Sequence, residues 1–140
     1  KTFYHGHSFT GNPLASSIAV ENLKIFEEEN ILNSIQPKIN KLKTELEKFK
    51  KLEYVGDIRQ IGMIGAVEIV KNKKTKESFP FQERIGYKIY KECLKRGALL
   101  RPLGDTLYFM PPYIITEDQI AELTNIAFDS IKSVLDEYNA

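Results

Sequence analysis

Apolar residues spaced three and four apart predict two helices in the first third of the chain. They occur at Leu14, Ile18, Leu23 and Phe26, and again at Ile35, Ile39, Leu42, Leu46 and Phe49. This spacing places the side chains of each stretch on one helix face. Asn12 offers a side-chain cap and Pro13 suits a first helical turn, so the first helix is expected over 13–29. The second is expected over 31–51, where Pro37 in the first turns allows a kink.

The pattern changes to that of β-structure after the second helix. The stretch YVGDIRQIGMIGAVEIV (residues 54–70) is rich in β-branched residues and punctuated by glycines. It predicts strands over 58–60 and 63–70, with the glycines marking bulges or close approaches of the backbone. Two short strands, over 99–101 and 106–110, are expected on either side of a Gly-Asp turn.

Two further helices complete the predicted elements. One is expected over 81–96 with Gly97 as its C-cap, and the other follows Thr116, a good N-cap, to the end of the chain. The lysine-rich run at 71–76 is interpreted as a solvated loop. This order of elements predicts an α+β fold in which a small, mainly antiparallel sheet is covered by helices.

Composition narrows the functional classes. The 140 residues include 20 basic and 19 acidic side chains, with a net charge of +1. This balance argues against nucleic acid or an anionic membrane as the main partner, because both favour a concentrated positive surface. The sequence has no apolar run of about 18 residues, so it predicts no membrane-spanning helix. Cys93 is the one cysteine, so we expect no intrachain disulfide, a buried thiol and a cytoplasmic location.

The opening stretch HGHSFTGNPLASS (residues 5–17) gathers groups that suit a polar ligand, at His5, Gly6, His7, Ser8, Thr10 and Gly11. Three interpretations compete. His5 and His7 suggest a metal site, but no carboxylate or cysteine lies nearby in the sequence to complete it. In the second interpretation, the stretch is only a polar loop that precedes a capped helix. The third interpretation is an anion site, because glycines, hydroxyls and a helix N-terminus meet there.

The segments FYHGHSFTGNPLASSIAVENL, GDIRQIGMIGAVEIV and RIGYKIYKECLKRGALLRPLGDTLYFMPPYIIT resemble class III (fold-type I) pyridoxal-phosphate-dependent aminotransferases over essentially the whole chain. The resemblance implies a cofactor-phosphate and interface loop with a connecting helix over 1–29. It implies the C-terminal small domain of a homodimeric enzyme over 30–140. Within the family, RPLGDTLYFMPPYIIT and HSFTGNPLA are most similar to the members of biotin biosynthesis that convert 8-amino-7-oxononanoate to 7,8-diaminononanoate.

The resemblance also implies roles for particular residues. The hydroxyl and N–H of Ser8 would bind the phosphate of pyridoxal 5'-phosphate held mainly by the other subunit, with the His7 backbone beside it. Gly6 would lie against the substrate. Arg101 would bind the substrate carboxylate, and Tyr108 would lie near the active site. Ser8 stands where the family usually has threonine, and His7 where it commonly has proline.

The lysine that binds the cofactor, the aspartate that pairs with its pyridine nitrogen and the aromatic stacked on its ring all precede the opening loop in this family. We therefore expect a C-terminal portion of a longer enzyme, with no catalytic residue and no activity of its own. The amino donor stays open between S-adenosylmethionine and lysine. Arg59 and Arg84 are interpreted as surface charges. The alternatives are another class III ω-aminotransferase or a non-catalytic α+β interaction module.

Overall fold

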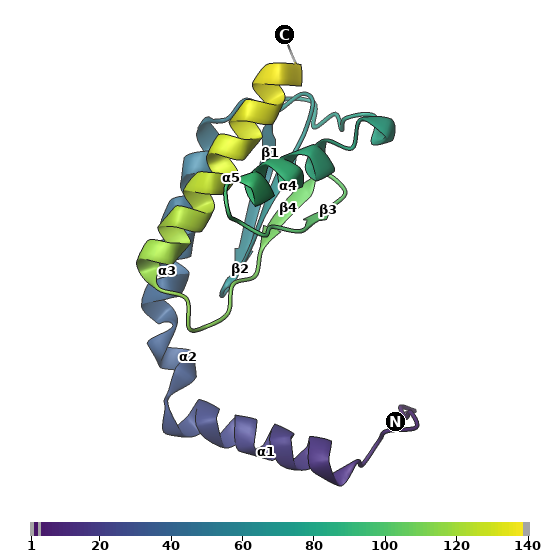
Figure 1. The fold of residues 1–140 in the computed structure, drawn as a ribbon, viewed down its shortest axis with the longest axis vertical. Helices are drawn as coiled ribbons and strands as arrows, with labels where there is room; N and C mark the ends of the chain where they lie inside the picture. Colours follow the sequence, from purple (N-terminus) through teal and green to yellow (C-terminus); the bar gives the residue numbers. More distant parts are fainter. Residues whose placement is uncertain (1, 3, 139–140) are drawn as a thin grey trace. The chain divides into compact units, whose positions relative to one another are not determined.

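The computed structural model describes residue 2 and residues 4–138, and the chain divides into two compact units, residues 1–36 and 37–140. Figure 1 traces the chain through both units. The predicted division into a loop with a connecting helix (1–29) and a small domain (30–140) stays a prediction.

The first unit consists of the opening loop and two helices, α1 (Pro13–Glu28) and α2 (Ile31–Ser34). Oδ1 of Asn12 accepts a hydrogen bond from the N–H of Ala15 at 3.0 Å, and Pro13 occupies the first helical position. The predicted cap and start of this helix are therefore confirmed. No side chain of α1 is buried, and its large apolar residues other than the half-buried Phe26 are exposed to solvent.

The helix predicted over 31–51 is interrupted. After α2, the chain forms α3 (Gln36–Glu47) and a 3-10 turn, η1 (Lys48–Lys51). The prediction of one continuous helix was therefore wrong. Pro37 lies in the first turn of α3, where its missing N–H leaves no helical hydrogen bond unmade.

The second unit contains a four-stranded antiparallel sheet in the order β1-β2-β4-β3. Its strands are β1 (Val55–Ile61), β2 (Ile64–Ile69), β3 (Pro102–Leu103) and β4 (Thr106–Phe109). A register shift at Gly56 marks a bulge in β1, as the glycine pattern predicted. The prediction of a small, mainly antiparallel sheet is confirmed.

Two glycines with positive φ close the two hairpins. Gly62 (φ 54°) begins the two-residue turn from β1 to β2, and Gly104 (φ 59°) begins the predicted Gly-Asp turn from β3 to β4. That second turn pairs Leu103 with Thr106 at once. The strand predicted over 99–101 was therefore misplaced. Because the turn has only two residues, strand pairing begins directly beside it, and β3 is Pro102–Leu103.

The core lies between one face of the sheet and the helices α3, α4 (Ile85–Lys95) and α5 (Glu117–Tyr138). Along β4, Leu107 and Phe109 are buried, whereas Thr106 and Tyr108 alternate with them and are half-buried. The ring of Phe49, just after α3, lies 6.0 Å from that of Phe109. Helices thus cover one face of a small sheet, which confirms the α+β prediction.

The helix predicted over 81–96 also has a break. Residues Phe81–Glu83 form a 3-10 turn, η2, and Arg84 takes a left-handed backbone (φ 48°) before α4 begins. Gly97 (φ 91°) follows the C-cap Arg96, so the predicted glycine stop lies one residue beyond the cap.

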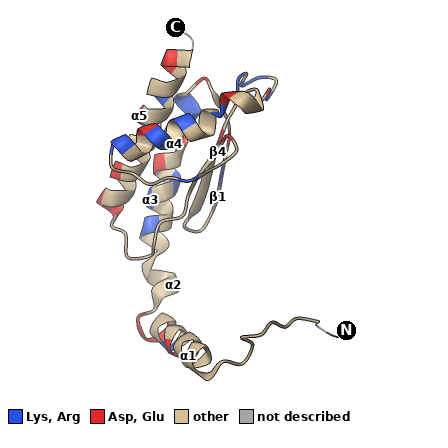
Figure 2. Cartoon of the chain, turned by 45° about the vertical axis from the view of Figure 1, so that its right-hand side comes forward, with Lys and Arg blue, Asp and Glu red and all other residues tan. Residues whose placement is uncertain are grey.

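The start of α5 and the lysine-rich loop are both held by specific hydrogen bonds. Thr116 Oγ1 accepts from the Gln119 N–H at 3.2 Å, and Gln119 Oε1 accepts from the Thr116 N–H at 2.9 Å, a reciprocal capping box that confirms the predicted start of α5. Lys73 donates to the carbonyl of Lys50 at 2.6 Å, so the lysine-rich loop is tied to the domain at this point. Figure 2 shows basic and acidic bands interspersed on α3 and α4.

Candidate functional site

The opening loop is held in a tight turn by its own side chains. The carbonyl of His7 accepts from the Thr10 N–H at 3.0 Å, and the Thr10 hydroxyl accepts from the His7 N–H at 3.0 Å. His7 Nδ1 accepts in turn from the Phe9 N–H at 3.2 Å. Local hydrogen bonds of this kind give a short polar segment a defined backbone without any packed core.

This turn leaves Ser8 available at its tip. Ser8 is exposed, and within the described part of the chain its hydroxyl and N–H have no hydrogen-bond partner. The site of a Cβ on Gly6 has no neighbouring atom within 4 Å, so a ligand could approach its backbone closely. The N–H of His7, by contrast, is already engaged by Thr10. The predicted roles of Gly6, His7 and Ser8 stay predictions.

The two histidines of the loop lie near each other, with ring centroids 6.1 Å apart. Among the residues that the structure describes, no group of three His, Cys, Asp or Glu side chains is placed to hold a metal ion. His7 instead serves the turn, through its Nδ1.

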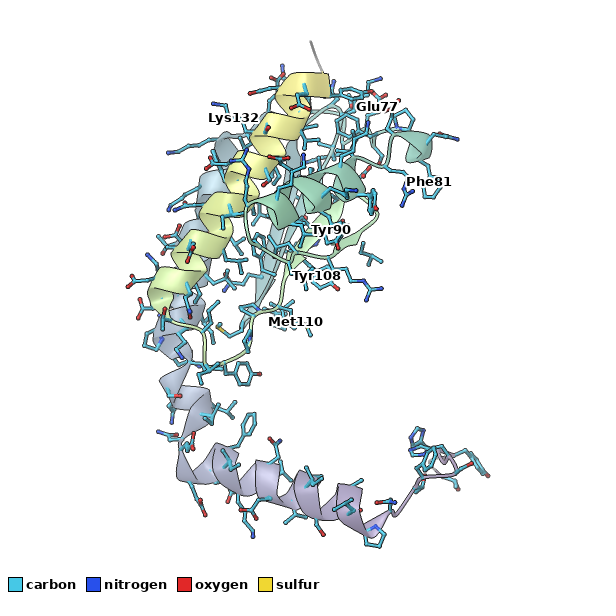
Figure 3. All side chains as sticks on the ribbon, viewed as in Figure 1. Glu77, Phe81, Tyr90, Tyr108, Met110 and Lys132 are labelled. Atoms are coloured by element: carbon cyan, nitrogen blue, oxygen red, sulfur yellow. The ribbon has the colours of Figure 1, made fainter. Side chains whose placement is uncertain are left out.

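Arg101 lies immediately before β3 and lines a pocket of about 540 Å³ in the second unit. The wall of this pocket is largely aromatic and apolar, with Phe81, Tyr87, Tyr90 and Leu99. Figure 3 labels Phe81 on η2 and Tyr90 on α4. A pocket of this size, apolar with a few charged groups, is typical of small-molecule sites.

Arg84 lines the same pocket, which sequence reasoning missed. Its Cζ lies 4.4 Å from the centroid of the Tyr87 ring. Arg84 is exposed, as expected for a surface charge, but it also borders this pocket. A signal was present: Arg84, Tyr87 and Tyr90 recur every three residues, offset from the buried stripe of α4 that includes Ile89 and Cys93.

Arg59 is a surface charge, as predicted. Its guanidinium lies 2.6 Å from Asp57 and 2.7 Å from Glu68, and all three side chains are substantially exposed. An exposed ion-pair group of this kind contributes little to stability.

Arg101 and Tyr108 come from neighbouring strands. Pro102 pairs with Leu107, so Arg101 and Tyr108 each lie one residue beyond this pair. Tyr108 is half-buried and does not line the pocket that Arg101 lines. Their assignment to the substrate site stays a prediction.

Cys93 is fully buried on α4. Burial raises the pKa of its thiol above the ordinary value, so the reactive thiolate is disfavoured. The expected role as a small core residue is confirmed. Among the described residues, no helix combines the length and apolar character needed to cross a bilayer.

Comparison with known proteins places this chain in a family. Residues 1–131 match the family model described as Aminotransferase class-III. The chain is 46% identical over 137 residues to an adenosylmethionine-8-amino-7-oxononanoate aminotransferase of Aquifex aeolicus, covering 98% of this chain and 29% of that relative. The chain thus spans less than a third of the length of this relative.

Solved structures agree in fold. The enzyme of the same name from Methanocaldococcus jannaschii superimposes with a TM-score of 0.88 and 42% identity, covering 94% of this chain and 30% of that one. A PMP-bound aminotransferase from Vibrio fluvialis gives a TM-score of 0.87 at 26% identity, covering 97% of this chain and 30% of that one. With the family model matching nearly the whole chain, the protein belongs to the class-III aminotransferases.

Proposed function

We propose that the protein carrying this chain is a pyridoxal-phosphate-dependent aminotransferase of biotin biosynthesis, which converts 8-amino-7-oxononanoate to 7,8-diaminononanoate. The observation that carries this proposal is Arg101, which forms no ion pair within the described residues and lines an aromatic and apolar pocket. The proposed substrate is a nine-carbon keto acid with a distal carboxylate. Its carboxylate could bind the arginine and its aliphatic chain could lie against the apolar wall. The 46% identity to the Aquifex aeolicus relative supports the same substrate.

The opening loop suits the phosphate end of the cofactor. Ser8 offers a hydroxyl and an N–H at the tip of a turn, and the helix that begins at Pro13 adds the positive end of its dipole. Pyridoxal phosphate, when bound, supplies the electron sink for amino transfer. Ser8 would hold its phosphate, and Thr10 would keep the turn in shape through the His7 N–H.

Arg101 would orient the substrate rather than react with it. A guanidinium can donate two parallel hydrogen bonds to a carboxylate, which fixes both position and direction. The apolar wall around it would exclude water from the aliphatic chain and strengthen that ion pair. Tyr108, on the adjacent strand and outside this pocket, would lie near the active site, as the family resemblance implies.

The assembly, donor and location are part of the same proposal. The protein would act as a homodimer in the cytoplasm, with residues 5–11 reaching the cofactor of the other subunit. The exposed apolar side chains of α1, including Leu14 and Ile18, support an interface in this region. S-adenosylmethionine is the proposed amino donor, with lysine as the alternative.

An assay of the full-length protein tests the proposal. Purified enzyme would be given 8-amino-7-oxononanoate with either donor, and 7,8-diaminononanoate would be followed by mass spectrometry. We expect this acceptor to be preferred over pyruvate. Arg101→Gln should raise the KM for the acceptor about tenfold or more, since a charge-assisted pair is lost. Equal use of pyruvate, with an unchanged KM in the variant, would favour a different ω-aminotransferase.

Ser8 gives an independent test. Ser8→Ala should weaken pyridoxal phosphate binding several-fold, whereas Ser8→Thr keeps the hydroxyl and should bind normally. The cofactor absorbance at increasing cofactor concentration measures both. Equal affinities in the two variants would show that the Ser8 hydroxyl does not bind the phosphate.

A further inference from the structure

The pocket at Arg101 holds a second guanidinium that the proposed function does not use. The chain has four arginines, and two of them, Arg59 and Arg96, form ion pairs with nearby carboxylates. Within residues 2 and 4–138, the other two, Arg84 and Arg101, form none. These two line the same pocket.

The backbone at Arg84 gives no reason for an arginine. Its φ of 48° is in the left-handed region, which glycine and asparagine adopt at lower cost. Its carbonyl accepts the Lys88 N–H at 3.0 Å and so begins α4, a role that any residue can fill. The reason for an arginine must therefore lie in its side chain, which stacks on Tyr87 and borders the pocket.

The charge balance of the pocket favours an anion. Asp105 also lines it, but Oδ1 of Asp105 already accepts the Gly86 N–H at 2.9 Å. The pocket is therefore lined by two cationic side chains and by one anionic side chain whose Oδ1 already accepts a hydrogen bond. Stacking on Tyr87 occupies the face of the Arg84 guanidinium and leaves its N–H edge free to donate.

We infer that Arg84 is a second carboxylate-binding residue of this pocket, acting with Arg101 to select aliphatic substrates that carry a distal carboxylate. The identity of that substrate rests on the proposed function, whereas the site itself rests on the pocket. The aromatic wall takes the aliphatic chain and the two arginines take its charged end. Arg84 contributes to binding and selectivity, with no part in the amino transfer.

Binding of an unreactive probe to the full-length protein tests this inference. Nonanoate and its uncharged amide, nonanamide, would be titrated by calorimetry against the wild type, Arg84→Asn and Arg84→Lys. Asparagine suits a left-handed backbone, so this variant should fold normally. Arg96→Gln is the matched control, because Arg96 is a paired, exposed arginine outside the pocket.

We expect Arg84→Asn to weaken nonanoate binding about tenfold and to leave nonanamide binding unchanged. Arg84→Lys should fall between, since it keeps the charge and loses the planar fork. Arg96→Gln should match the wild type. Unchanged nonanoate affinity in Arg84→Asn, or an equal loss for the amide, would overturn the inference.

The same variants separate this inference from the proposed function. If nonanoate binding depends on Arg84 but the wild type does not turn over 8-amino-7-oxononanoate, the site stands and the proposed reaction is wrong. If the wild type turns over this substrate and Arg84→Asn leaves its KM unchanged, the proposed reaction stands and the Arg84 site is wrong.

Discussion

The N–H of Gly86 donates a 2.9 Å hydrogen bond to Oδ1 of Asp105, which joins the first turn of α4 to the turn between β3 and β4. The approach is so close that a Cβ on Gly86 would lie 2.0 Å from the carbonyl oxygen of Gly104. That oxygen belongs to the backbone of a two-residue turn and cannot swing aside. The glycine therefore sets the position of α4, and with it the wall of the pocket.

Gly86→Ala should destabilise the protein by about 2–3 kcal/mol, because the helix must move away from the turn. Urea unfolding followed by circular dichroism measures this change. Gly6→Ala is the control, since a Cβ at Gly6 meets no atom within 4 Å. Equal stability of the two variants would mean that the turn yields more easily than its backbone geometry indicates.

Glu45 should make the protein sensitive to acid. It is 3% exposed, it pairs with Lys48 and Lys41, and the hydroxyl of Thr124 lies 3.4 Å from its Oε2. Burial alone would raise the pKa of Glu45, but the hydrogen bonds from Lys48 and Lys41 outweigh it and hold the pKa below the ordinary 4.5.

Because that pKa is lower in the folded state, the unfolded state binds the proton more readily. The stability that Glu45 contributes is complete above about pH 4.5 and is lost as the pH falls through the folded value. Urea unfolding from pH 7 to pH 3 should therefore show a steeper loss for the wild type than for Glu45→Gln. Parallel curves would show that Glu45 does not contribute to acid unfolding.

Cys93 should be inert in the native protein. Its burial and raised pKa both disfavour thiolate, so modification requires unfolding. We expect an aromatic disulfide reagent to label Cys93 about a hundredfold more slowly in buffer than in denaturant. Fast labelling under native conditions would mean that α4 opens locally, and hydrogen exchange along α4 would check this directly.

Thr10 should matter to the proposed cofactor site without touching the cofactor. Thr10→Val removes the acceptor of the His7 N–H and should weaken pyridoxal phosphate binding several-fold in the full-length enzyme, whereas Thr10→Ser keeps the bond. Titration of the apoenzyme with cofactor provides the comparison. Identical affinities would show that the turn holds its shape without this hydroxyl.

Local chemistry was enough to predict much of the fold. The Asn12 and Thr116 caps and the Gly104–Asp105 turn depend on neighbouring residues, and all three appear as expected. The break at Arg84 was not foreseen, and the one at Ile35 was anticipated only as a possible kink near Pro37. Apolar periodicity continues across both breaks, so the pattern alone could not reveal them.

The candidate site was harder to predict because it depends on the tertiary fold. Arg84 and Arg101 are separated by the whole of α4, and no local rule indicates that they share a pocket. Once Gly86 brings the start of α4 against the Gly104 carbonyl, the two arginines come to the same region. Local chemistry marked the opening loop as a candidate anion site, and the family resemblance then assigned the phosphate role to Ser8 within it.

Helix α1 has sixteen residues and no buried side chain, which has a kinetic consequence for its amides. A helix of this length without packing is marginally stable in water. Its amide protons should therefore exchange rapidly with solvent, through local helix–coil fluctuations. The amide protons of α5, which is anchored by buried residues such as Ile120 and Ile131, should exchange only when the second unit unfolds. The segment that carries the Ser8 loop would then become rigid only when another surface covers its apolar side.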